Sequence, residues 1–178
     1  MRLWLDRRAS PIGDMLVGWD AQGQLRVLDF VDFESRMMRL LRLHYGDFVL
    51  ESGAAPTSLA DSFRRYFSGE IAALDEIAVA TGGTDFQKAA WTALRGVKPG
   101  ERLSYGDLAR RLGHPKAVRA VGGANGANPV AIVVPCHRVV GSGGALTGYG
   151  GGLHRKAWLL AHEARYTRSA GTDLFAHP

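Results

Sequence analysis

The sequence predicts an α+β fold: an N-terminal antiparallel three-stranded sheet with helices, then a mostly helical C-terminal domain with a helix-turn-helix. Three observations support this fold class. Short stretches of mixed apolar and polar residues alternate with turns at the start, two helix-capping motifs follow later, and the pair Gly82 and Gly83 separates the two parts. We therefore expect domains over residues 1–82 and 83–168 and a loose tail over 169–178.

The N-terminal domain is expected to be a scaffold. Strands are predicted over 2–8, 14–20 and 25–33, and the turns between them are short enough for hairpins, which favours an antiparallel meander. Helices are predicted over 34–44 and 58–67, where apolar residues recur at helical spacing. No catalytic cluster is evident in this half of the sequence.

The C-terminal domain begins with two capping boxes, which predict helix starts at Thr84 and Ser104. The second of these helices should end before Gly113. Pro115 suits the first turn of a further helix over 116–124. Two short helices joined by a glycine-containing turn are typical of a helix-turn-helix.

Charge is unevenly distributed along the chain. Residues 1–82 contain 9 Lys or Arg and 12 Asp or Glu, a net charge of −3, whereas residues 83–168 contain 13 and 4, a net charge of +9. One Asp in the last ten residues brings the total to +5. Such a basic half is typical of a nucleic-acid-binding protein. A solvated basic face with no partner is the alternative interpretation.

The helix predicted over 116–124 is unusually rich in small residues, among them Ala120, Gly122 and Gly123. Glycines inside a helix cost about 1 kcal/mol each relative to alanine, so another advantage should offset them. A slim helix surface suits the DNA minor groove, which is only about 6 Å wide. Arg119 is the one long residue in mid-helix, and we expect it to enter the base stack. Close packing against another helix would explain the small residues equally well.

The only cysteine of the chain, Cys136, follows the apolar run 130–134, which predicts a buried strand ended by Pro135. A thiol in that position is either inert core or a nucleophile, and the outcome depends on whether the protein can ionise it. The glycine-rich loop 148–152 is expected to expose backbone N–H groups to a planar ligand. A last helix is predicted over 154–164.

The sequence also predicts several absences. No apolar run approaches the roughly 20 residues that span a bilayer, and the N-terminus lacks the apolar core of a signal peptide. With a single cysteine no internal disulfide can form, so we expect a cytoplasmic protein without membrane contact. No His or Cys cluster has metal-ligand spacing, so neither a metal nor a cofactor is expected.

Taken together, the C-terminal motifs resemble the O6-alkylguanine-DNA alkyltransferases, also called methylated-DNA–protein-cysteine methyltransferases. The resemblance covers roughly residues 83–164. It is carried by the ordered motifs T-x-F-Q, S-Y-G-D-L-A, R-A-V-G-G-A, N-P-V, P-C-H-R-V, G-Y-x-G-G-L and W-L-L-A-H-E.

This resemblance implies direct-reversal DNA repair in a single turnover. The alkyl group of an O6-alkylguanine, and also of an O4-alkylthymine, would move irreversibly from duplex DNA to Cys136. The base would be flipped out through the minor groove, since chemistry on a base requires its extrusion. We expect no cofactor in this chain and a monomer acting on double-stranded DNA.

The resemblance also implies a role for each residue of the catalytic motifs. Cys136 would accept the alkyl group, and His137 would take the thiol proton through a water molecule. Glu163 would orient the imidazole. Asn128 would brace the turn before the cysteine, and Tyr105 would donate a proton or hydrogen bond to the leaving guanine.

Further residues would bind the substrate and the DNA. The carbonyls of Cys136 and Val139 would accept from the exocyclic amine of the base. Arg119 would fill the vacated stack. The base would lie against the loop residues Tyr149, Gly150 and Gly151, and the DNA against Ala120, Gly122, Gly123 and Tyr105. Two positions depart from some relatives: Gly150 replaces a serine, and Ala131 replaces a proline.

Two other functions remain open from the residues alone. One is a helix-turn-helix regulator with a redox-sensing Cys136. The other is a cysteine hydrolase using Cys136, His137 and Glu163, which is disfavoured because a directly following histidine usually points away from the thiol.

Overall fold

The computed structural model describes residues 1–173, with side chains described through residue 168. The N-terminal half contains a four-stranded sheet with the order β3-β2-β1-β4. Strands β1, β2 and β3 form an antiparallel meander, and β4 pairs in parallel with β1. Their bounds are Arg2–Arg8 (β1), Met15–Asp20 (β2), Leu25–Phe30 (β3) and Val49–Ser52 (β4).

The predicted α+β class is confirmed, but the predicted number of strands is wrong. Strand β4 was missed because it has only four residues, all exposed or half-buried, and therefore no apolar pattern. Its parallel pairing with β1 also requires a long connection, which runs through the helix Glu34–Tyr45 (α1) and leaves no hairpin signal in the sequence. The third strand ends at Phe30, because Val31–Phe33 form a short 3-10 helix, η1.

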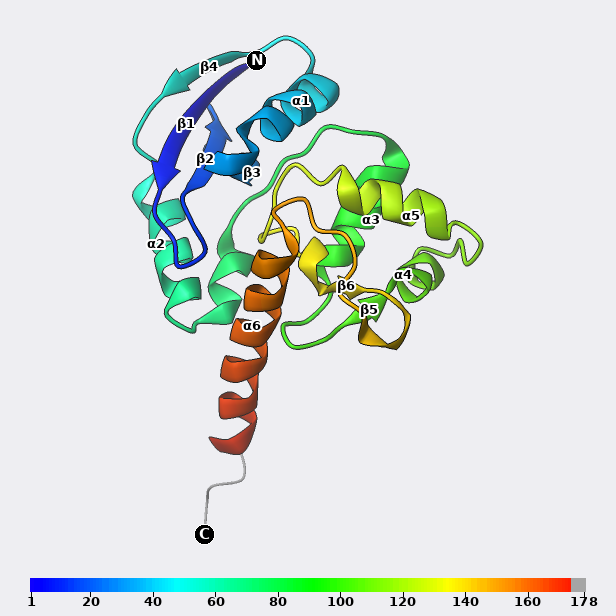
Figure 1. Cartoon of the computed structure of the whole chain (residues 1–178). Helices are drawn as coiled ribbons and strands as arrows, with labels where there is room; N and C mark the ends of the chain where they lie inside the picture. The colour runs from blue at the N-terminus through cyan, green and yellow to red at the C-terminus, as the bar shows by residue number, and fades with distance from the viewer. Residues whose placement is uncertain (174–178) are drawn as a thin grey trace.

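The remaining helices lie largely where the sequence placed them (Figure 1). Both capping boxes are present, with Thr84 and Ser104 each accepting from a backbone N–H three residues on. The α-helices after α1 are Thr57–Phe67 (α2), Asp85–Arg95 (α3), Tyr105–Arg111 (α4), Val118–Gly126 (α5) and Leu153–Asp173 (α6); 3-10 helices span Ile71–Glu76 (η2), Cys136–Arg138 (η3) and Ser142–Gly144 (η4).

Two of these helices differ from the expected bounds. Helix α5 starts at Val118, so Pro115 lies in the preceding turn rather than in the first helical turn. Helix α6 continues past 164 to Asp173, so the first part of the expected tail is helical. The rest of that tail, residues 174–178, lies outside the described residues. None of the helices in the described part of the chain is long and apolar enough to cross a membrane.

The apolar run before Cys136 is fully buried, but the strand predicted there is wrong. It forms a turn in which Ile132 adopts a φ of 69°, a left-handed conformation that is strained for a β-branched residue. Only Val130 forms a β-bridge, with Leu28 at the edge of the N-terminal sheet. A short apolar run indicates burial but does not by itself separate a strand from a buried turn.

The segment that contains Cys136 therefore pairs with both halves of the chain, through Val130 before it and Val139–Val140 after it. After η3, the strand Val139–Val140 (β6) pairs in parallel with Leu103–Ser104 (β5) just before α4. One continuous core includes side chains from both halves, such as Phe30, Tyr66 and Leu159. The domain boundary near residue 82 stays a prediction.

Candidate active site

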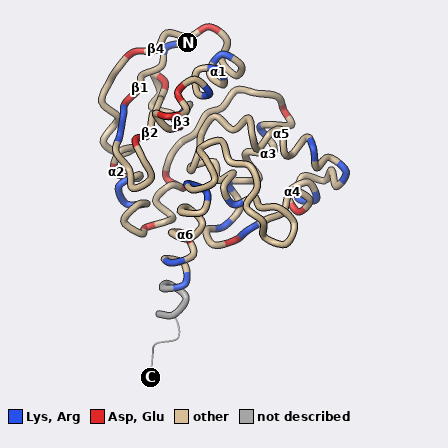
Figure 2. Tube along the Cα trace, in the orientation of Figure 1, with Lys and Arg blue, Asp and Glu red and all other residues tan. Residues whose placement is uncertain are grey.

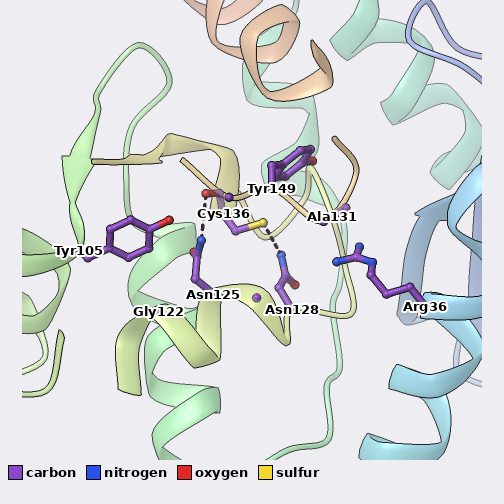
Figure 3. Close-up of a pocket in the computed structure, with 11 residues that line it drawn as sticks. Arg36, Tyr105, Gly122, Asn125, Asn128, Ala131, Cys136 and Tyr149 are labelled. Atoms are coloured by element: carbon purple, nitrogen blue, oxygen red, sulfur yellow. Dashed lines mark hydrogen bonds between the residues drawn. The ribbon is translucent and has the colours of Figure 1, made fainter. Parts of the chain in front are cut away.

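A cavity of ≈ 280 Å³ opens beside the sulfur of Cys136 (Figure 3). Cys136 itself is only 6% exposed, so the sulfur lies at the bottom of this cavity rather than on the surface. Residues from α1, α4, α5, the turn before the cysteine and the glycine-rich loop line it: Arg36, Tyr105, Gly122, Asn125, Gly126, Asn128, Ala131, Cys136, Gly148, Tyr149 and Gly150.

Asn128 holds the buried turn and touches the sulfur. Its Nδ2 donates to the carbonyl of Val134 at 2.9 Å and to Sγ of Cys136 at 3.2 Å, and its Oδ1 accepts from the N–H of Val130 at 2.9 Å. One amide therefore closes the strained turn at both ends. Its hydrogen bond to Sγ also favours the ionised form of the sulfur.

Burial raises the pKa of the Cys136 thiol, and it outweighs the lowering effects of the Asn128 hydrogen bond and of the positive charges of Arg36 and Lys156. The resting sulfur therefore keeps its proton at neutral pH. Since the thiolate is the nucleophilic form, this site requires a base to remove that proton.

A histidine and a carboxylate lie behind the cysteine. His137 is fully buried, and its Nε2 lies 3.0 Å from both carboxylate oxygens of Glu163. Burial alone would raise the pKa of Glu163, but His137 and Arg138 together hold it well below its usual range. Because an ionised carboxylate only accepts, Nε2 must carry the proton, and Nδ1 of a neutral imidazole is then a free base. Nδ1 is buried and has no hydrogen-bond partner among the described residues.

Two further residues hold Glu163, and the sequence did not indicate either of them. Arg138 donates from Nε and Nη2 to the carboxylate at 2.8 and 2.9 Å, and Tyr66 of α2 donates its hydroxyl at 2.8 Å. Tyr66 matched the apolar face of a helix, which gave no sign of a polar role. Glu163 is thus fixed by groups from two separate parts of the chain, α2 and η3.

Arg36 of α1 forms one wall of the cavity, and it too was missed. Its guanidinium is fixed by Asp29 at 2.9 Å. It occupies the space that a side chain at position 150 would need, since a Cβ built on Gly150 would collide with it. Gly150, which stands where some relatives have a serine, therefore leaves room for the Arg36 guanidinium from the N-terminal half.

The glycine-rich loop packs against β3, and two buried cations bind its carbonyl groups or those next to it. A Cβ on Gly151 would come within 2.9 Å of the Phe30 ring, so close packing on β3 explains this glycine. Arg155 donates to the carbonyls of Gly151 and Ile12, and the fully buried Lys156 donates to the carbonyl of Thr147 at 2.6 Å. These cations fix the loop above the sulfur.

The outer face of α5 is open. Arg119 and Ala120 are exposed, and a Cβ on Gly122 or Gly123 would meet nothing within 4 Å. Packing against another helix therefore does not explain these two glycines. Figure 2 shows Lys and Arg positions clustered around α4 and the start of α5, close to this face.

The structure brings together many of the residues selected from the sequence. Cys136, Asn128, Tyr105, Tyr149, Gly150 and Gly122 line the cavity, while His137 and Glu163 bond to each other and do not line it. Val139 and Gly151 do not line it, and Arg119, Ala120 and Gly123 lie on the surface of α5. Within the described residues, no group of three or more His, Cys, Asp or Glu side chains could hold a metal ion.

Comparison with known proteins places this site in a family. Residues 85–165 match the model described as 6-O-methylguanine DNA methyltransferase, DNA binding domain. A Salmonella typhimurium protein named methylated-DNA–protein-cysteine methyltransferase is 48% identical over 92% of this chain and 96% of its own length. A Methanosarcina acetivorans protein of the same name is 42% identical over 86% and 94%.

Solved structures agree with the sequence relatives. The crystal structure of Mycobacterium tuberculosis O6-methylguanine methyltransferase matches with a TM-score of 0.75 at 37% identity, covering 92% of this chain and 94% of that one. A crystal structure of Mycobacterium tuberculosis OGT in complex with DNA matches with a TM-score of 0.74 at 35% identity, covering 93% and 94%.

Proposed function

This chain belongs to the 6-O-methylguanine DNA methyltransferase family, and we propose that it moves the alkyl group of an O6-alkylguanine in duplex DNA irreversibly to its own Cys136. It is a DNA-binding repair protein of the methylated-DNA–protein-cysteine methyltransferase class. The observation that carries the assignment of the acceptor is that Cys136 lines a cavity, while the next residue, His137, forms a buried imidazole–carboxylate pair with Glu163.

The proposed activation follows from the protonation states of the site. The thiol is protonated at rest, so a base must act when the substrate is bound. Nδ1 of His137 has no hydrogen-bond partner among the described residues, and in a neutral imidazole it would accept the proton of Sγ through a bridging water. Glu163 then stabilises the imidazolium that forms, which is the role of a carboxylate behind a catalytic histidine.

The displacement forms one bond at the alkyl carbon and breaks another. The thiolate attacks the alkyl carbon, a new S–C bond forms, and the C–O bond to the base breaks. The electron pair of the broken bond returns to the base, which regains the O6 carbonyl and takes up one proton at N1; this proton balances the one that His137 removed from the thiol. Tyr105 lines the same cavity and would polarise the departing guanine through its hydroxyl. The thioether product is stable, so each protein molecule would react once.

The open face of α5 supports docking in the minor groove. Its glycines leave a slim surface, its small side chains lie on the solvent side, and basic residues flank it. The cavity reaches this face, because Gly122 belongs to both. A base flipped out through the minor groove would enter from α5 and leave Arg119 to fill the stack. The same pocket would also admit O4-alkylthymine, and the protein would act as a monomer.

A redox-sensing regulator fits this site poorly. Redox-sensing cysteines combine exposure with a low thiol pKa, whereas Cys136 is buried and its pKa is raised. A hydrolase would need repeated turnover and is distinguished by the first test below.

The test of the proposed function is a transfer experiment with duplex DNA that carries methylguanine with a labelled methyl group. We expect label to appear on the protein up to one methyl group per molecule and then to stop. Label released as methanol would indicate a hydrolase. The absence of any label on the protein would contradict the assignment.

Arg119→Ala should slow repair of duplex DNA by about tenfold or more, because filling the stack offsets the cost of base extrusion. Reaction with the free modified base should change little, since no extrusion is needed there. The control is Arg2→Ala, which removes an exposed positive charge from β1, an element that Figure 1 shows well apart from α5. Equal slowing of the duplex and free-base reactions would rule out the stacking role.

A further inference from the structure

The buried side chain of Asn125 has an unused acceptor at the cavity. Asn125 lies on α5, is 8% exposed and lines the cavity beside Cys136. Its Nδ2 lies 3.5 Å from the carbonyl oxygen of Cys136, a contact drawn as a dashed line in Figure 3. Its Oδ1 is buried and has no hydrogen-bond partner among the described residues.

The chemistry of the contact fixes which way the amide faces. A backbone carbonyl can only accept, so the NH₂ end of Asn125 must face Cys136, and the reversed amide would bring two oxygens together. Oδ1 is therefore the end left over. A buried acceptor without a partner is destabilising, and proteins rarely retain one without a use.

An O6-alkylated guanine offers one kind of matching group. Alkylation at O6 removes the hydrogen from N1, so the 2-amino group is the only N–H donor left on the base. That amine has two hydrogens and can donate to two neighbouring acceptors at once. Near Asn125, the carbonyl of Cys136 and Oδ1 provide such a pair, with Oδ1 in place of the expected carbonyl of Val139, which does not line the cavity. Figure 3 shows the Tyr105 hydroxyl directed toward the same side of the cavity.

We propose that Oδ1 of Asn125 accepts a hydrogen bond from the 2-amino group of the extruded base and so makes the site selective for alkylguanine over alkylthymine. This inference rests on the proposed function. An O4-alkylated thymine has no exocyclic amine and no ring N–H, so it would leave Oδ1 unpaired. A site that leaves a buried polar group unpaired discriminates against that substrate.

The test is a cycle of two substitutions, one in the protein and one in the substrate. Transfer rates are measured for wild type and Asn125→Leu, which keeps the side-chain shape but removes both polar atoms. The substrates are duplexes with O6-methylguanine or with O6-methylhypoxanthine, the same base without the 2-amino group. We expect the preference of wild type for methylguanine to fall about fivefold to tenfold in the variant, the usual value of one neutral hydrogen bond.

A third substrate separates the possible failures. Transfer from O4-methylthymine should not slow in Asn125→Leu and should rise, because the variant lacks the acceptor that this base leaves unpaired. A variant slowed equally on all three bases, or an unchanged preference for methylguanine, would overturn the inference while leaving the proposed function intact. If wild type transferred nothing from any base, both this inference and the proposed function would be overturned. Asn125→Ala replaces the leucine variant if thermal unfolding shows that leucine does not fit.

Discussion

Cys136→Ala is expected to take up no methyl label from alkylated DNA while still binding the duplex. Cys136 is the only thiol in the chain, so no second sulfur can replace it as an acceptor. Its sulfur is buried and contributes nothing to the basic surface, so affinity for duplex DNA should stay within about threefold, since phosphate contacts dominate that affinity. Gel shift and label transfer on the same preparation measure both quantities.

Cys136→Ser is the matched control for this prediction. It keeps a hydroxyl at the same position and the hydrogen bond from Asn128, but an alcohol is far harder to ionise than a thiol. We expect folding and DNA binding to persist and transfer to be undetectable. Label on the protein in either variant would mean that another residue accepts the alkyl group.

Local signals predicted the helices around this site. The capping boxes at Thr84 and Ser104 depend on contacts between residues three apart, so the sequence displays them directly, and both form. The burial of the run before Cys136 was also evident from composition. The left-handed turn at Ile132 was not, because it is imposed by Asn128 and by the edge of β3, neither of which appears in the apolar pattern.

The parts of the site that were missed depend on residues far apart in the chain. Tyr66 and Glu163 are 97 positions apart and meet only because α2 packs near α6. Arg36 reaches the cavity from a helix that looks like ordinary scaffold, and Asn125 is polar in a helix noted only for its small residues. The N-terminal half therefore supplies one wall of the cavity, through Arg36, and one hydrogen-bond donor to the Glu163 carboxylate, through Tyr66.

Glu163→Gln is expected to have the largest effect after loss of the thiol. The carboxylate is 1% exposed and accepts from His137, Arg138 and Tyr66. The amide would turn an NH₂ group toward these donors and leave Arg138 as a buried cation without its partner. Breaking a buried ion pair costs about 3–5 kcal/mol of unfolding free energy, which urea unfolding measures. Methyl transfer should slow by about a hundredfold, because the imidazole loses its orienting base.

The pH dependence of that loss provides a further check. Because the pKa of Glu163 is lower in the folded state than the 4.5 of a free side chain, its contribution to stability is complete above about pH 4.5. This contribution is lost as the pH falls toward the pKa of Glu163 in the folded protein. The difference in unfolding free energy between wild type and Glu163→Gln should therefore shrink on acidification. Glu76→Gln is the control: its side chain is 57% exposed and pairs with Arg65 on the surface, so it should lose no more than about 1 kcal/mol. A folded Glu163→Gln protein that transfers methyl groups at the wild-type rate at pH 7 would show that the carboxylate has no part in activating the thiol.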